Sequence, residues 1–263
     1  MSVWSNKAIV SLLNMTRGMM NKHIEISRIT KTVALLLMSG LSVRDVDPKI
    51  VRTCLDSQKT DGGFIGNSDT IWNIKLLEYY PEYCEQRRRA LDWLKHGNGS
   101  EPGYGRSKRD MHRIPVTGLA LYLLPELADD ATCAWLEHIW LTEKNSLTYK
   151  AAYTLLAFRK NNYLPRHNTL IDDAVAWLVS QQQDSGGFSP WRDHPVGENV
   201  YCTALATLAL IAQEEESLNQ SIIKAYDYLC STQLSSGIWA YHEIEDGASW
   251  GLLALTDCER YLR

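Results

Sequence analysis

Several features that would classify this 263-residue chain at once are missing from its sequence. It has no excess of basic residues, because 27 Lys and Arg face 31 Asp and Glu, whereas proteins whose main partner is nucleic acid usually show a strong basic excess. Its longest fully apolar runs, such as residues 33–38, are far shorter than the roughly 20 residues that a membrane-spanning helix needs. We therefore expect no nucleic-acid partner and no transmembrane protein.

The six cysteines include no Cys-x-x-Cys pair, which excludes a zinc ribbon and a thioredoxin-like motif. Lys7 and Arg17 interrupt the N-terminal apolar stretch, so we expect no secretory signal. Unpaired cysteines fit a reducing compartment, and we expect a cytoplasmic protein. Alternating runs rich in β-branched residues are also missing, so a β-sheet is not expected.

Short turns that begin with glutamine recur along the chain. Three stand out, at 58–64 (QKTDGGF), 183–188 (QDSGGF) and 233–238 (QLSSGI), and 101–104 (EPGY) is a degenerate fourth copy. The distance from Tyr104 to Phe188 is 84 residues, which is two units of 42. We therefore predict a fifth copy that has lost its glycines at Ser146 and Leu147.

Each turn separates an amphipathic helix from a more apolar one. The apolar helices are expected at 28–39, 68–80, 114–127, 149–162, 199–213 and 246–259, and the first amphipathic helix is expected at 3–20. Helices that are apolar all round are buried, whereas amphipathic helices keep one apolar stripe. The pattern predicts an all-α protein in which six inner helices lie inside six outer ones, a closed (α/α)6 toroid.

We expect one domain over residues 1–263. Residues 1–27 would form the N-terminal outer helix and its connection, and residues 28–260 the repeat region. The glycine-rich stretch at 97–105 lies within the repeat pattern, so it is interpreted as a loop and not as a linker between domains.

The turn Gln-x-x-Asp-Gly-Gly-Phe, followed by an inner helix rich in Thr and Ala, resembles the repeat of the terpenoid cyclase and protein prenyltransferase β-subunit superfamily. The likeness lies in 58–64, in 183–188 with 203–210, and in 233–239 with 249–255. It implies the toroid fold and an enzyme that handles isoprenoids. We interpret Gln58, Gln183 and Gln233 as structural residues that bond free carbonyls at the end of the preceding helix.

The run Glu243-Ile-Glu245-Asp246 resembles the Asp-x-Asp-Asp motif of class II terpene cyclases, in which the middle carboxyl protonates an alkene. Carried over by position, Glu245 would be the acid, with Asp246, Glu243 and His242 as partners. Clustered carboxylates repel one another, which raises the pKa of at least one of them. Glu replaces Asp twice and Gly247 stands where Thr is usual, so the alternative is that the acids only favour a helix N-terminus.

Side chains in the first turn of each inner helix are expected at one rim of the barrel. Aromatic rings there would stabilise a carbocation by roughly 0.5–2 kcal/mol each. The predicted substrate-binding residues of this rim are Asp69, Trp72, Tyr149, Tyr153, Asn199, Tyr201, Cys202 and Trp250.

A basic cluster precedes the inner helix at 114–127 and comprises Arg106, Lys108, Arg109, His112 and Arg113. Arg109, His112 and Arg113 would hold a diphosphate, because arginine presents a planar fork and the helix N–H groups add to it. The alternative is a solvated loop.

We expect no metal and no cofactor. A zinc site like that of the protein prenyltransferases needs a thiolate at the position of Ala248. Cys202, Asp246 and either His242 or His194 would be the remaining ligands, and a small buried role for Cys202 is favoured over metal binding.

These features favour an acid-initiated cyclisation or isomerisation of an isoprenoid, or of another natural-product intermediate, in an aromatic-lined cavity. The expected partner is a small hydrophobic substrate. One alternative is a protein that binds or transfers a prenyl diphosphate. A second is a toroid without catalytic activity that binds a hydrophobic ligand or a protein. A third is a carbohydrate lyase or hydrolase on the same barrel, which an open, polar mouth would favour.

Overall fold

The computed structural model describes residues 2–22, 25–97, 101–143 and 147–263. Within these ranges the chain forms twelve α-helices and four short 3₁₀ turns, and no β-strand is present apart from one isolated bridge between Gln182 and Phe188. The predicted all-α class and the count of twelve helices are confirmed. In this part of the chain, no helix has both the length and the apolar character that crossing a bilayer requires.

The helices alternate along the chain between an inner and an outer layer. The inner helices are α2 (Ile26–Met38), α4 (Asn67–Leu77), α6 (Ile114–Leu123), α8 (Thr148–Lys160), α10 (Val200–Ile211) and α12 (Ile244–Tyr261). The outer helices are α1 (Val3–Asn21), α3 (Pro48–Asp56), α5 (Cys84–Gly97), α7 (Asp130–Glu143), α9 (Leu170–Ser180) and α11 (Asn219–Thr232). The 3₁₀ turns are η1 (Val43–Asp45), η2 (Pro81–Tyr83), η3 (Pro125–Leu127) and η4 (Glu216–Leu218).

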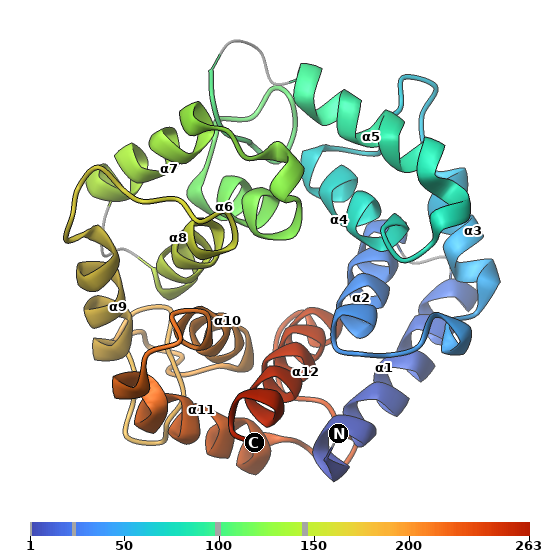
Figure 1. Ribbon diagram of the computed structural model, residues 1–263. Helices are drawn as coiled ribbons and strands as arrows, with labels where there is room; N and C mark the ends of the chain where they lie inside the picture. Colours follow the sequence, from blue (N-terminus) through green and yellow to red (C-terminus); the bar gives the residue numbers. More distant parts are fainter. Residues whose placement is uncertain (1, 23–24, 98–100, 144–146) are drawn as a thin grey trace.

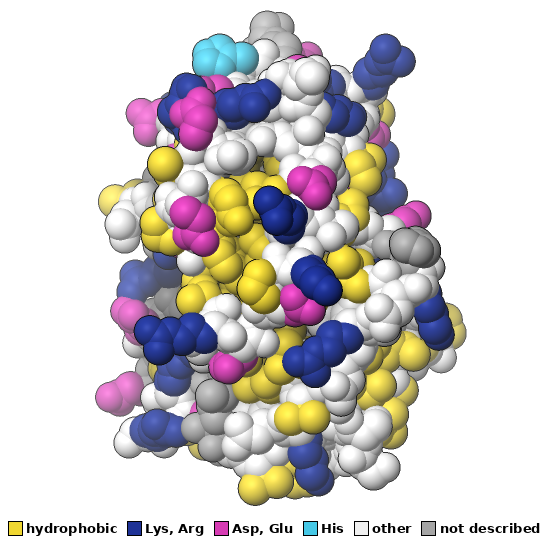
Figure 2. All heavy atoms as spheres, turned by 90° about the vertical axis from the view of Figure 1, so that its right-hand side faces the viewer, with side chains coloured by type: hydrophobic (Ala, Val, Ile, Leu, Met, Phe, Trp, Pro, Cys, Tyr) yellow, Lys and Arg dark blue, Asp and Glu magenta, His cyan; other side chains and the backbone are white. Residues whose placement is uncertain are grey.

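The inner helices form a closed ring inside the outer helices (Figure 1). Each inner helix packs against the inner helix before it and the one after it, and α12 packs against α2, which closes the circle. The predicted closed (α/α)6 toroid is therefore confirmed. Seen from the side on which α3 and α5 lie, the outer surface mixes acidic and basic side chains around a hydrophobic patch (Figure 2).

The two layers differ in how much of each helix is buried. In α10, every residue from Cys202 to Leu210 is buried, and the helix is apolar on all sides. In α5, only Ala90 and Leu94 are buried, and the exposed residues include Glu85, Arg88 and Lys95. The hydrophobic effect thus sorts the helices, because a helix without a polar face is stable only in the inner ring.

A glutamine side chain connects each well-formed turn to the next outer helix. The Gln58 amide donates to the Gly62 carbonyl at 2.8 Å, inside its own turn, and to the Gln86 carbonyl of α5 at 2.9 Å. The Gln182 amide makes the same pair of bonds, to its own turn and to α11, both at 2.9 Å. One side chain therefore holds the turn in shape and fixes it to the neighbouring repeat.

Two expectations about these glutamines are wrong. The equivalent of Gln58 is Gln182 and not Gln183, because only Gln182 makes both bonds. Gln183 instead donates to the Arg192 carbonyl at 3.1 Å, in the loop that leads to α10. The carbonyl outside the turn also belongs to the following outer helix, not to the end of the preceding one.

The same arrangement closes the ring between the last turn and the first helix. The Gln233 amide donates to the Gly237 carbonyl and to the Trp4 carbonyl of α1, both at 3.1 Å. Nearby, the Ser2 backbone N–H donates to the Glu259 carboxylate of α12 at 2.9 Å. The two ends of the chain are thus joined by the same bonds that join neighbouring repeats.

The first glycine of each turn is required by its conformation and by its surroundings. Gly186 has a φ of +90°, and a Cβ there would lie 2.2 Å from the Lys224 carbonyl oxygen of α11. Gly62 and Gly237 also have positive φ and approach carbonyl oxygens of α5 and α1 in the same way. A side chain at these positions would separate the turn from the next outer helix.

The turns also hold the beginning of the inner helices. The backbone N–H of the turn's aromatic residue donates to a threonine of the following inner helix, from Phe64 to Thr70 at 3.1 Å, from Tyr104 to Thr117 at 2.8 Å and from Phe188 to Thr203 at 2.9 Å. The N-termini of the inner helices are therefore set at one end of the ring, which we call the mouth. The predicted fifth turn lies partly outside the described residues, and Leu147 directly precedes α8.

Candidate functional site

Two pockets open at the mouth, and both are lined by the second and third residues of inner helices. In the first, which we call the acid pocket, these residues are Ser27 and Arg28 of α2, Ser68 and Asp69 of α4, and Glu245 and Asp246 of α12. In the second, the basic pocket, they are Pro115 and Val116 of α6 and Tyr149 and Lys150 of α8. The repeat thus gives equivalent positions different side chains around one opening.

The acid pocket has a volume of about 410 Å³ and brings six predicted site residues together. These are Asp69, Trp72, His242, Glu243, Glu245 and Asp246. They come from helices α4 and α12 and the loop before α12, and α2 lies between those two helices in the ring (Figure 1).

The Asp246 carboxyl is largely buried at the start of α12. Its side chain is 12% exposed, and the Lys31 ammonium lies 2.5 Å from its Oδ1 atom. Burial raises the pKa of Asp246; the charge of Lys31 opposes this rise, while the charges of Glu243 and Glu245 add to it. The balance leaves the pKa above the ordinary value of an aspartate, as an acid catalyst requires.

Glu245 differs from Asp246, although the two are neighbours in the sequence. The Arg28 guanidinium donates to its carboxylate. Burial raises the pKa of Glu245, but the hydrogen bond from Arg28, a backbone N–H and the charges of Arg28 and Lys31 outweigh burial, so the pKa is lowered. Of these two neighbouring carboxyl groups, Asp246 thus has the raised pKa and Glu245 the lowered one, whereas the sequence pointed to Glu245 as the acid.

Asp69 contributes a second carboxyl with a raised pKa to the acid pocket. Burial raises the pKa of Asp69, and a backbone N–H and the Ser27 hydroxyl oppose the rise by hydrogen bonding to the carboxylate. Two carboxyl groups with raised pKa values thus face one pocket from α4 and α12.

Aromatic rings lie next to the acid pocket and fill the centre of the ring. The buried Trp250 meets Trp72, Tyr153 and Tyr201 edge-on, with ring centroids 5.9, 6.1 and 6.5 Å apart. The hydroxyls of Tyr153 and Tyr201 are 3.1 Å apart and hydrogen-bonded, and burial raises the pKa of both well above that of a free tyrosine. The Lys31 ammonium lies 5.8 Å from the ring of Trp72, so this ring already faces one cation.

The basic pocket has a volume of about 390 Å³ and contains three residues of the predicted cluster, Arg106, His112 and Arg113. The Arg113 guanidinium pairs with Asp110 at 3.0 Å, and His112 Nδ1 bonds the Pro102 carbonyl at 2.7 Å. Arg109 is exposed and does not line this pocket.

Two other predicted residues have structural roles. Asn199 caps α10, since its side-chain oxygen accepts the backbone N–H of Cys202 at 2.9 Å. Cys202 is buried, and burial raises its pKa to about 12, so its thiol stays protonated. Among the described residues, no three His, Cys, Asp or Glu side chains come together as a possible metal site.

Sequence reasoning missed Arg28 and Lys31, which supply the cations of the acid pocket. They lie on α2, and no glycine-rich turn precedes this helix, so the repeat motif did not point to its first turn. The available signal was positional, because Arg28 is the third residue of its inner helix, as Asp69 and Asp246 are of theirs.

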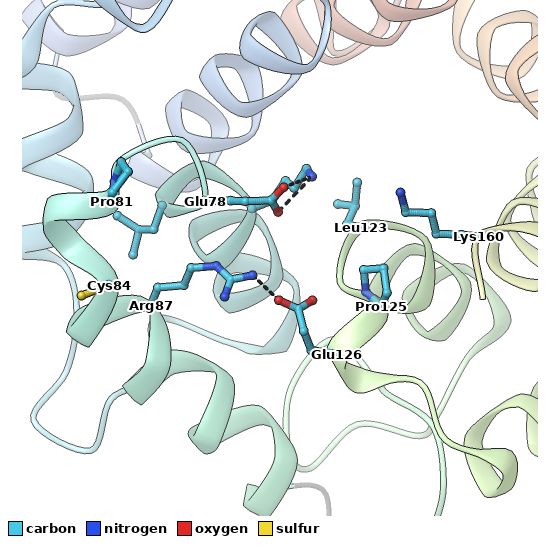
Figure 3. A pocket seen from close by; sticks show the side chains of 10 residues that line it. Glu78, Pro81, Cys84, Arg87, Leu123, Pro125, Glu126 and Lys160 are labelled. Atoms are coloured by element: carbon cyan, nitrogen blue, oxygen red, sulfur yellow. Dashed lines mark hydrogen bonds and ion pairs between the residues drawn. The ribbon is translucent and has the colours of Figure 1, made fainter.

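A further pocket of about 420 Å³ lies at the opposite end of the ring (Figure 3). It is lined by residues near the C-terminal ends of α4, α6 and α8 and by the start of α5. Its charges are largely paired with one another, Lys75 with Glu78 at 3.0 Å and Arg87 with Glu126. No aromatic side chain lines it, so the chemistry expected from the sequence fits the mouth better.

Neither a protein-family model nor a curated protein sequence matches this chain. Solved structures do resemble it. A variant of the type II terpene cyclase MstE from Scytonema, in complex with its substrate geranylgeranyl dihydroxybenzoate, aligns with a TM-score of 0.67 and 13% identity over 98% of this chain and 99% of that one.

Two other solved structures give the same fold. A protein from Actinoplanes aligns with a TM-score of 0.66 and 13% identity over 89% of this chain and 90% of its own. A possible member of the GH105 family from Salmonella enterica aligns with a TM-score of 0.54 and 13% identity, over 88% of this chain and 83% of its own. At such identities the likeness shows the helical toroid fold alone.

Proposed function

We propose that this chain is an enzyme that protonates a carbon–carbon double bond of an isoprenoid, or of another natural-product intermediate, and so starts its cyclisation or isomerisation. The observation that supports this best is the Asp246 carboxyl. It is largely buried, its pKa is raised, and it lines a pocket together with Trp72. A carboxyl with a raised pKa beside an aromatic ring is what this reaction needs.

In the proposed step, the O–H bond of the Asp246 carboxyl breaks and a C–H bond forms at one alkene carbon. The other alkene carbon becomes a cation, which the faces of Trp72 and the neighbouring rings stabilise. The cation then reacts with a second double bond of the substrate and ends by losing a proton, so that a double bond is restored. Asp246 recovers its proton from solvent.

In this proposal, the charged residues around Asp246 have different roles. Arg28 keeps Glu245 ionised, so Glu245 has no proton to give, and the pair adds little net charge near the cation. Lys31 holds the Asp246 carboxyl in place through its contact with Oδ1. His242 and Glu243 are exposed residues of the pocket, and we assign them the return of the proton from water.

The choice of an isoprenoid rests on two supports. The repeat turns resemble those of the terpenoid cyclases, and the aligned MstE structure contains a geranylgeranyl compound as its substrate. We therefore take polyprenyl chains with an aromatic or polar head as the first substrates to test.

The test is turnover in D₂O with a panel of such compounds, followed by mass spectrometry. A product that is an isomer of the substrate and contains one new C–D bond is expected. Asp246→Asn should abolish the deuterium uptake, whereas Glu245→Gln should retain it. Product formation without deuterium, or full activity of Asp246→Asn, would contradict the proposal.

A second candidate function follows from the charged wall of the acid pocket. Arg28, Lys31 and Asp69 give the pocket polar partners that a plain hydrocarbon does not need. An unsaturated or acidic carbohydrate would use them, with Asp246 again as the acid. Oligosaccharides with a terminal double bond belong in the same D₂O panel, and deuterium uptake by them alone would favour this candidate.

A further inference from the structure

The proposed function uses only one of the two pockets at the mouth. The basic pocket is built from the same helix positions, but its inward side chains are different. Arg106, His112, Arg113 and Lys150 line it together with the ring of Tyr149. Such a combination of planar guanidinium groups, an ammonium and an aromatic ring suits an oxyanion attached to an apolar group.

The charges of this pocket limit how much negative charge it accepts. Lys150 pairs with Glu143 at 2.5 Å, and Arg113 pairs with Asp110 at 3.0 Å. Three cations, with Arg106 as the third, therefore face two carboxylates, and one positive charge is left over. A single carboxylate balances that charge, whereas a diphosphate would bring an excess of negative charge next to Glu143 and Asp110.

A line of rings connects the basic pocket with the acid pocket. Tyr149 of the basic pocket lies 6.3 Å from Tyr201, which stacks on Tyr241 at 5.7 Å, and Tyr241 lies 4.2 Å from His242 of the acid pocket, all measured between ring centroids. An apolar chain that crosses the mouth from one pocket to the other would therefore lie along aromatic surface.

We propose that the basic pocket binds the carboxylate head of the substrate, through Arg106 and Arg113, while the apolar tail crosses these rings toward Asp246. The substrate is thereby assigned to a class, an amphipathic carboxylic acid with an unsaturated tail. The assignment of the tail's double bond to Asp246 rests on the proposed function; the binding of the head does not.

Head-group binding is tested on the whole protein by NMR titration with benzoate, with inorganic pyrophosphate as the competing anion at equal ionic strength. Arg106→Gln and Arg113→Gln should each weaken benzoate binding by about tenfold or more, as expected for a charged hydrogen bond. Arg109→Gln is the matched control, because Arg109 belongs to the same loop but lies outside the pocket. Equal losses in all three variants, unchanged binding in Arg106→Gln, or tighter binding of pyrophosphate than of benzoate would overturn the proposal.

The path of the tail is tested with dodecanoate, which has no double bond and so binds without reacting. Dodecanoate should shift the indole N–H signal of Trp72 in the acid pocket, benzoate should not, and Arg113→Gln should remove the shift at the same dodecanoate concentration. A Trp72 shift that persists in Arg113→Gln would mean that the two pockets bind separately and would refute the shared ligand. Because neither probe is turned over, these results stand apart from the success or failure of the alkene protonation.

Discussion

The turns of this protein have nearly the same residues and hydrogen bonds in several repeats, whereas the rim of its mouth does not. In the turns, Gln58, Gln182 and Gln233 make the same two hydrogen bonds, and each is followed by a glycine with positive φ. At the rim, no two of the six inner helices have the same pair of second and third residues, although Ser, Tyr and Asp each occur twice. These pairs are Ser27 and Arg28, Ser68 and Asp69, Pro115 and Val116, Tyr149 and Lys150, Tyr201 and Cys202, and Glu245 and Asp246.

This difference distinguishes the residues that stabilise the ring from the residues that would bind or act on a substrate. A residue that recurs in equivalent turns has a structural role, because it attaches each repeat to the next outer helix. At the rim it is the pair of residues that does not recur, although each repeat holds these positions in the same way, so each pair is free to serve one site. If this is right, changes in the turns should cost stability, and changes at the rim should cost activity while the fold remains.

The largest effect is expected at the rim, for Asp246→Asn. The substitution keeps the shape of the side chain and removes its proton, and general acid catalysis contributes about 10²–10⁴-fold to a rate. Turnover should fall by that factor, while thermal unfolding followed by circular dichroism stays near that of the wild type. A variant that loses its helical signal along with its activity would place Asp246 among the structural residues and weaken the distinction.

In the turns, Gly186→Ala should reduce the free energy of unfolding by about 2–4 kcal/mol. The left-handed backbone costs an alanine about 1–2 kcal/mol. The approach of its Cβ to the Lys224 carbonyl adds the cost of a forced displacement. Urea unfolding measures both effects together.

Gly197→Ala is the control for this experiment, since Gly197 also has a positive φ but a Cβ there would meet nothing within 4 Å. It should show the backbone cost alone. Equal losses in the two variants would mean that contact with the next outer helix is not what the turn glycine provides.

A smaller loss, about 1–2 kcal/mol, is expected for Gln182→Ala, because the variant leaves the Ser221 carbonyl and the Gly186 carbonyl without their donor. Gln220→Ala is the control, because Gln220 is an exposed residue of α11, the outer helix that also contains Ser221. This variant should change the free energy of unfolding by less than about 0.5 kcal/mol. If both variants unfold at the same urea concentration, the glutamine does not connect the repeats.

The smallest effect concerns Glu245→Gln and depends on pH. Because the folded-state pKa of Glu245 is lowered, its ionised form stabilises the fold above the unfolded-state pKa, and this contribution is lost as the pH falls through the folded-state value. The wild type should therefore exceed Glu245→Gln in stability at pH 7 and lose that advantage toward pH 3. Glu101→Gln, an exposed position, should show no such trend, and a constant difference at Glu245 would contradict the Arg28 pairing.

The fold was predictable because the turn motif recurs several times along the sequence. Glutamine, glycine and an aromatic residue at recurring positions give the number of helix pairs, and apolar character separates inner from outer helices. The one-residue error at Gln183 arose because three glutamines, 181–183, are consecutive there, and only the hydrogen bond to the Gly186 carbonyl distinguishes Gln182.

The location of the site could be predicted from the sequence, but the pKa shifts of its carboxyl groups could not. The run at 243–246 pointed to the correct helix end, but the pKa of each carboxyl depends on Arg28 and Lys31, which lie more than 200 residues away in the sequence. No local pattern indicates which acid meets which cation. Nor does a local pattern indicate that the basic pocket joins Arg113 with Lys150 of another helix and leaves out Arg109.

The most direct test of the central claim is to titrate the two neighbouring carboxyl groups by ¹³C NMR on protein labelled at Asp and Glu. The resonances are assigned with Asp246→Asn and Glu245→Gln. Asp246 should titrate above the ordinary range of an aspartate, because burial outweighs its contact with Lys31, and Glu245 should titrate below the ordinary range of a glutamate. A spectrum in which Glu245 holds its proton to higher pH than Asp246 would contradict the account of which residue is the acid.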